Sequence, residues 1–138
     1  DARRRALMQL YIDTSALVKL VVAEVESTSL RRYLGQFGED TRITSALART
    51  ELIRAVARQG SLEIIQHARR VVGALDLVAL TTAVLDRAGE VPPPELSTLD
   101  AIHLSAALTA PDLRALVTYD ARLGEAATNA GITVVAPR

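Results

Sequence analysis

Four acidic residues occupy positions in this sequence where carboxylates can act on a phosphodiester. They are Asp13 after the apolar run LYI, Glu51 in TELIRAV, Asp100 in LDAIHLSAAL and Asp120 after LVTY. Magnesium is commonly held by one or two carboxylates together with water and substrate phosphate. A group of four carboxylates repels itself unless a cation neutralises it, and a bound cation activates water and offsets charge on phosphate. The set therefore predicts metal-dependent phosphodiester chemistry.

Each acid also has a structural explanation when it is taken alone. Asp13 and Asp120 lie between a predicted strand and a predicted helix, where Asp is a favoured helix N-cap. Ser97 and Asp100 fit the S-x-x-D pattern of a capping box. Glu51 lies inside a predicted helix with an arginine one turn further along, which is typical of an ordinary surface ion pair. The chemical interpretation therefore depends on whether the fold brings the four together.

Short β-branched runs alternate with longer amphipathic stretches, which predicts an α/β fold with a parallel sheet. We expect strands at 8–12, 42–44, 77–80, 115–118 and 132–135, and helices at 16–23, 26–37, 46–58, 62–74, 82–88, 97–109 and 120–130. A five-stranded sheet of this kind is doubly wound, with its ligand site beyond the carboxyl ends of the strands where the strand order reverses. Asp13 and Asp120 directly follow two predicted strands.

The 138 residues suffice for one domain with a substantial core, and 49% of them are hydrophobic. We expect residues 1–7 to be an N-terminal extension or a segment added for expression, and residues 8–138 to form the domain. The formal net charge is zero, which argues against a generic polyanion binder. No apolar run reaches the length of a membrane span, and the absence of cysteine is compatible with the cytoplasm, where we expect the protein.

The sequence resembles the PIN-domain ribonucleases, and among them the VapC toxins of bacterial toxin–antitoxin pairs. The segments that carry the resemblance are LYIDTSALVKL, TELIRAV, LDAIHLSAAL and LVTYDARLGEAATNAGITVV. Together they span the chain from Met8 to about Val135. The resemblance implies a PIN-like parallel sheet of five strands in the order 3-2-1-4-5, with helices on both faces. It also implies endonucleolytic cleavage of RNA that depends on Mg²⁺ or Mn²⁺.

Residue by residue, the resemblance places Asp13, Glu51, Asp100 and Asp120 at the four acidic positions of the family. Asp13 and Asp100 take the positions that hold the metal most directly, and Asp120 completes the metal shell or binds a second ion. Glu51 orients or deprotonates the attacking water. Ser15 and Thr118 are candidate hydroxyl donors, and arginines such as Arg122, or those of the helix at 46–58, are candidate contacts for RNA phosphate. The number of metal ions and the identity of the general base stay open.

The resemblance further implies a VapB-like antitoxin that covers the acidic site, and a homodimer. Two alternatives stay open: a non-catalytic PIN-like module that binds RNA or protein, and a PIN nuclease of RNA processing without a toxin role. A phosphoacceptor receiver domain is disfavoured because it requires a lysine at the end of the last strand, whereas the only lysine is Lys19 in the first predicted helix. His103 lies three residues after Asp100. We expect it to be a buried or hydrogen-bonded helix residue and not a metal ligand or a general acid.

Overall fold

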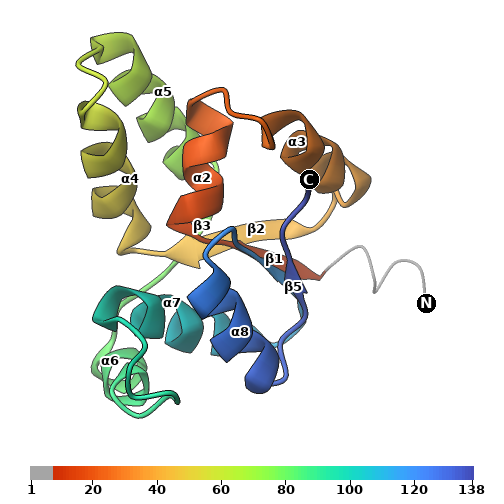
Figure 1. Ribbon diagram of the computed structural model, residues 1–138, viewed down its shortest axis with the longest axis vertical. Coiled ribbons are helices and arrows are strands. Elements are labelled where there is room, and N and C mark those ends of the chain that lie inside the picture. Colours follow the sequence, from red (N-terminus) through yellow and green to blue (C-terminus); the bar gives the residue numbers. More distant parts are fainter. Residues whose placement is uncertain (1–7) are drawn as a thin grey trace.

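The computed structural model describes residues 8–138 (Figure 1). Its elements in chain order are β1 (Gln9–Ile12), α2 (Thr14–Val21), α3 (Ser27–Gln36), β2 (Thr41–Ser45), α4 (Ala48–Ala57), α5 (Leu62–Gly73), β3 (Asp76–Val78), α6 (Thr82–Ala88), α7 (Thr98–Leu108), β4 (Leu113–Val117), α8 (Ala121–Asn129) and β5 (Val134–Val135). Every predicted strand and helix is present, with boundaries that differ by a few residues. The predicted extension at residues 1–7 lies outside the described part of the chain, and the proposed domain boundary stays a prediction.

The five strands form one parallel sheet in the order β3-β2-β1-β4-β5. Helices α2, α3, α4 and α5 lie on one face of the sheet, and α6, α7 and α8 lie on the other (Figure 1). The predicted fold class and strand order are therefore confirmed. The chain leaves the sheet in opposite directions after β1 and β4, so the carboxyl ends of these two neighbouring strands form the switch point.

Alternation along β1 decides which side chains meet each helical layer, because successive residues of a strand point to opposite faces. Leu10 and Ile12 pack into the core shared with α2, α3, α4 and α5. Tyr11 points to the opposite face, into the core that contains Leu104 of α7 and Leu123 of α8. This alternation places the Tyr11 hydroxyl beside α7, which carries the third of the four acids.

Helix α2 begins at Thr14, two residues before the predicted start. The physical reason is the Asp13 side chain, which accepts a hydrogen bond from the Ala16 backbone N–H and so makes Asp13 the N-cap of the helix. Strand β3 ends at Val78 and not at 80, because Thr81 already caps α6. Among residues 8–138, no helix has the length and apolar character needed to cross a membrane.

A buried ion pair lies at the amino ends of the strands, opposite to the switch point. The Arg114 guanidinium in β4 donates to both carboxylate oxygens of Asp40, which precedes β2, and it lies 4.2 Å above the Phe37 ring. The Asp40 side chain is only 1% exposed. Because a buried carboxylate needs its charge partner, this pair joins β4 to the chain that enters β2.

We expect Arg114→Met to lower the free energy of unfolding by about 2–3 kcal/mol, because it leaves the Asp40 carboxylate buried without its cation. Urea denaturation measures this loss. Arg31→Met on the exposed side of α3 is the matched control and should change stability by less than about 0.5 kcal/mol. Equal stability of the two variants would contradict the role given to the ion pair.

Candidate functional site

Asp13 is the most deeply buried of the four acids, at 3% exposure. Its Oδ1 accepts hydrogen bonds from the Ser15 hydroxyl at 2.7 Å and the Ala16 N–H at 3.1 Å. Its Oδ2 accepts from the Thr118 hydroxyl at 2.6 Å. Burial raises the pKa of this carboxyl, and the two hydroxyls act against that rise by stabilising the charged form. Asp13 is thus both the N-cap of α2 and an anion held at the switch point.

The two hydroxyls that serve Asp13 also fix the turn after β4. Thr118 Oγ1 accepts the Asp120 N–H at 3.0 Å, and Ser15 Oγ accepts the Tyr119 N–H at 2.9 Å. Both therefore donate to Asp13 and accept from the backbone that leads to Asp120. The expected use of Ser15 and Thr118 as hydroxyl donors agrees with this geometry, and the ends of β1 and β4 are joined through them.

Asp100 and Asp120 face each other from the first turn of α7 and the N-cap of α8. Asp120 accepts the backbone N–H groups of the first turn of α8, and Ser97 caps the helix that carries Asp100. Burial, followed by the nearby charge of Asp120 and a weaker effect of Asp13, raises the pKa of Asp100 to about 6. The fold therefore brings Asp13 and Asp120 close enough to Asp100 for both of them to raise the pKa of its carboxyl group.

Glu51 lies in the first turn of α4 and is oriented differently from a surface residue. Its Oε1 accepts from the Thr14 hydroxyl at 2.6 Å and lies 2.7 Å from His103 Nε2. Burial raises the pKa of Glu51, but these hydrogen bonds from His103 and Thr14 outweigh it and the net pKa lies below the ordinary value. Within the described chain no arginine pairs with Glu51, so the surface ion pair considered from sequence is wrong.

Three residues of the hydrogen-bond network around Glu51 have no role in the site that the sequence assigns: Thr14, His103 and, through His103, Tyr11. Thr14 follows Asp13 directly, and Tyr11 precedes it by two residues in the strand. His103 is 2% exposed, and its Nδ1 lies 2.8 Å from the Tyr11 hydroxyl, so the expectation of a buried, hydrogen-bonded histidine is confirmed. The presence of a polar aromatic residue at a buried position of an apolar strand indicates that Tyr11 has a hydrogen-bond partner, but only the fold shows that the partner is His103.

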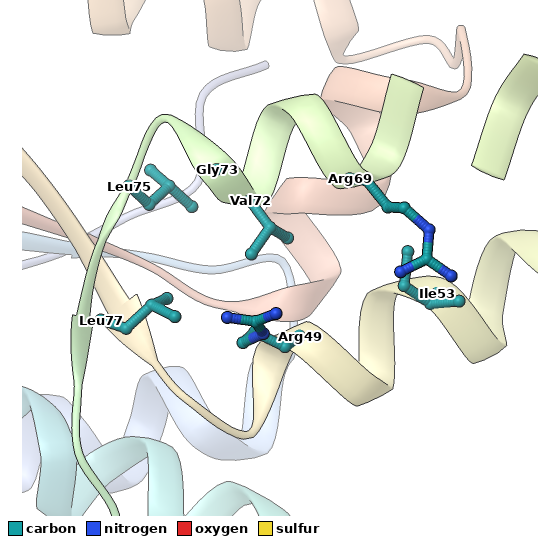
Figure 2. Close-up of a pocket in the computed structure, with 7 residues that line it drawn as sticks. All are labelled: Arg49, Ile53, Arg69, Val72, Gly73, Leu75 and Leu77. Atoms are coloured by element: carbon teal, nitrogen blue, oxygen red, sulfur yellow. The ribbon is translucent and has the colours of Figure 1, made fainter. Parts of the chain in front are cut away.

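A cavity of about 380 Å³ lies apart from the acids, between α4 and α5 beside the edge strand β3 (Figure 2). Arg49 and Arg69 line it together with apolar side chains such as Val72 and Leu77. Figure 2 shows the Arg69 side chain extending from α5 toward Ile53 of α4. No carboxylate lines this cavity, so we assign the chemistry to the carboxyl ends of β1 and β4.

The donors at the switch point suit a hard cation. Within residues 8–138 no three His, Cys, Asp or Glu side chains form a ready-made metal cage. Magnesium does not need one, because it keeps several waters and binds through one or two carboxylates and substrate phosphate. The chain has no cysteine, and both ring nitrogens of His103 lie within hydrogen-bond distance of other side chains. Carboxylate oxygens of Asp13 and Asp100 therefore fit Mg²⁺ or Mn²⁺ better than a softer metal.

The raised pKa of Asp100 gives a test of this electrostatic arrangement in metal-free protein. A folded-state pKa of about 6 against an ordinary 3.8 means that the folded chain binds this proton more tightly than the unfolded chain. The contribution of Asp100 to stability therefore falls as the pH rises from about 4 to about 6. We expect Asp100→Asn to stabilise the metal-free protein at pH 7.5 by about 1 kcal/mol, after discounting the shift for solvent screening of a partly exposed carboxylate.

Urea denaturation in EDTA measures this difference, with Asp86→Asn on the exposed side of α6 as the control that should change nothing. Added Mg²⁺ should stabilise the wild type and reverse the order, because a ligand of the folded state stabilises it by mass action. A destabilised Asp100→Asn protein in EDTA would show that the carboxylates do not repel one another.

Comparison with known proteins agrees with this fold. The model of the PIN domain family matches residues 10–129. Ribonuclease VapC46 of Mycobacterium tuberculosis is 46% identical over 129 residues, which cover 93% of this chain and 97% of the relative. Among solved structures, Mycobacterium tuberculosis VapC20, described as a sarcin–ricin loop cleaving toxin, superposes with a TM-score of 0.73 at 18% identity, covering 93% of this chain and 99% of the other.

A second solved structure, VapBC2 from Rickettsia felis bound to a DNA fragment of its promoter, matches with a TM-score of 0.70 at 16% identity, covering 93% of this chain and 98% of the other. At such low identities the two solved structures support the fold alone. The family model and the curated relative cover nearly the whole chain at high similarity. This chain therefore belongs to the PIN domain family and, within that family, to the VapC ribonucleases.

Proposed function

We propose that this protein is the toxin of a type II toxin–antitoxin pair and that it cleaves cellular RNA with Mg²⁺ at the carboxylates of Asp13, Asp100, Asp120 and Glu51. The observation that carries the proposal is the group of three aspartates at the switch point, in which burial and like charge raise the pKa of Asp100 to about 6. Nucleases of the PIN family generally act with a divalent metal. Like charges held together in this way indicate a cation site.

The aspartates of the site would hold a cation, and the cation would in turn bind the substrate phosphate. Asp13 and Asp100 would be the metal ligands, and Asp120 would complete the shell. A bound Mg²⁺ supplies an activated water and offsets the negative charge that develops on the phosphate. Three hydrogen bonds fix both oxygens of the buried Asp13 carboxylate, so this group keeps one orientation. A carboxylate fixed in this way would pre-organise the position of the cation, and a cation held in place stabilises the negative charge of phosphoryl transfer.

Glu51 orients the attacking water. Its hydrogen bonds with Thr14 and His103 occupy Oε1 and keep the carboxylate ionised, so this group accepts a hydrogen bond from water near the scissile phosphate. The exposed Arg122 lies two residues after Asp120 on α8 and is the candidate contact for a neighbouring RNA phosphate. Arginine suits that contact because its planar guanidinium pairs with two phosphate oxygens.

We expect Asp13→Asn to lower the rate of RNA cleavage by at least about 100-fold, a loss typical of removing one pre-organised electrostatic group. The measurement is mapping of new RNA 5′ ends after expression, together with cleavage of total RNA by purified protein with Mg²⁺ or with EDTA. Asp86→Asn should cut as the wild type does. Cleavage that persists in EDTA or in Asp13→Asn would refute the metal mechanism, and a wild type that makes no new ends would favour the binding-module alternative.

A VapB-like antitoxin is the proposed partner, and the solved VapBC2 complex among the structural neighbours supports this choice. We expect the partner to insert a basic side chain among the switch-point aspartates, where positive charge is favoured.

Co-expression with the small neighbouring gene product should abolish RNA cleavage and rescue growth, and size-exclusion chromatography should show a stable complex of the two. The proposal also includes a homodimer and a cytoplasmic location. A monomer that ignores the neighbouring gene product would contradict the toxin role.

A further inference from the structure

A buried chain of hydrogen bonds runs from the sheet to Glu51. The Ser45 backbone N–H donates to the Tyr11 hydroxyl oxygen at 3.1 Å. That hydroxyl lies 2.8 Å from His103 Nδ1, and His103 Nε2 lies 2.7 Å from Glu51 Oε1. Tyr11 is fully buried and His103 is 2% exposed. Four elements, β2, β1, α7 and α4, each contribute one member.

The groups at the two ends of this chain, a backbone N–H donor and a carboxylate acceptor, constrain the hydrogen bonds between them. The Glu51 carboxylate only accepts, so His103 carries a hydrogen on Nε2. The Tyr11 oxygen already accepts from the Ser45 N–H, which favours an arrangement in which its own hydrogen points to His103 Nδ1. A neutral imidazole that accepts at Nδ1 carries its hydrogen on Nε2. That hydrogen points at the Glu51 carboxylate, which is an acceptor only. The network therefore selects one tautomer of His103.

The result for Glu51 is a carboxylate with one fixed oxygen. Oε1 accepts from Thr14 of α2 and from His103 of α7, two donors on different helices. The side chain can then turn neither about its last bond nor away from the switch point without losing both bonds. Both of these hydrogen bonds use Oε1, so Oε2 is the oxygen that remains for the attacking water. His103 also lies one turn after Asp100 on α7, so its hydrogen bond to Glu51 fixes the position of Glu51 relative to the Asp100 carboxylate.

We propose that His103 is a positioning residue for Glu51 and that Tyr11 holds it in the tautomer with hydrogen on Nε2. Through this link the buried sheet sets the place of the water that attacks the RNA. The inference rests on the proposed function for its catalytic part and on the hydrogen-bond geometry alone for its tautomer. Groups that orient a reacting residue commonly affect activity by 10–100-fold, as do outer partners of metal ligands.

Two substitutions of His103 separate the donor to Glu51 from the partner of Tyr11. The Gln amide nitrogen can take the place of Nε2 and donate to Glu51, whereas the shorter Asn reaches only the place of Nδ1. We expect His103→Gln to keep kcat within about 10-fold of the wild type and His103→Asn to lower it by about 100-fold, both with KM nearly unchanged. His67→Asn, at a partly exposed position of α5, is the matched control and should cut normally.

Tyr11→Phe keeps the packed ring and removes the hydrogen that selects the tautomer, so it tests the link without disturbing the bulk of the core. We expect about a 10-fold lower kcat, and ¹⁵N NMR of the imidazole in the metal-free protein should show the Nε2–H form in the wild type and a mixture in the variant. Circular dichroism and thermal melting establish that each variant is folded before it is assayed.

The two readouts distinguish this inference from the proposed function. An imidazolium or an Nδ1–H form of wild-type His103 would overturn the inference whatever the activity. Equal kcat for His103→Gln, His103→Asn and the wild type would overturn its catalytic part. A wild type that cuts no RNA would refute the proposed function and the positioning of water with it, while the NMR measurement would still report on the hydrogen-bond chain.

Discussion

The structure depends first on the burial of the Asp13 carboxylate. A buried charge is costly unless hydrogen bonds replace the water that it loses, and Asp13 obtains three of them from α2 and from the end of β4. Satisfying this one group therefore joins the two strands at which the sheet reverses its order. Because Thr118 also accepts the Asp120 N–H, the same requirement places the next acid of the site.

The carboxylates of the proposed site also have the helix-capping role that each has when it is taken alone. Asp13 and Asp120 both cap helices, and Asp100 lies in the capped first turn of α7. The N-terminal end of a helix carries partial positive charge, so it stabilises a nearby anion. Three helix N-termini that converge at one edge of the sheet therefore help the chain to fold with several carboxylates close together, before any cation is bound.

The electrostatic environments of the acids divide them into two kinds. Burial raises the pKa of Asp13, and burial together with Asp120 raises that of Asp100, so both groups gain from a cation. The hydrogen bonds with His103 and Thr14 instead lower the pKa of Glu51. Opposite shifts among neighbouring titratable groups are typical of sites in which acids have separate roles. These shifts support the proposed division of roles, in which the aspartates bind the metal and Glu51 orients water.

The sequence by itself determined the fold class, the order of elements and the identity of the four acids, because hydrophobic period, capping residues and Gly or Pro breaks are local properties. The resemblance to PIN ribonucleases added the strand order and the expected roles. The surroundings of Glu51 could not be predicted, since Thr14, Tyr11 and His103 lie 37, 40 and 52 residues away from it along the chain. Only the tertiary packing of β1, α2, α4 and α7 brings these side chains together. The resulting contacts fix a helix glutamate that looks like a surface residue from the sequence, and they lower the pKa of its carboxyl group.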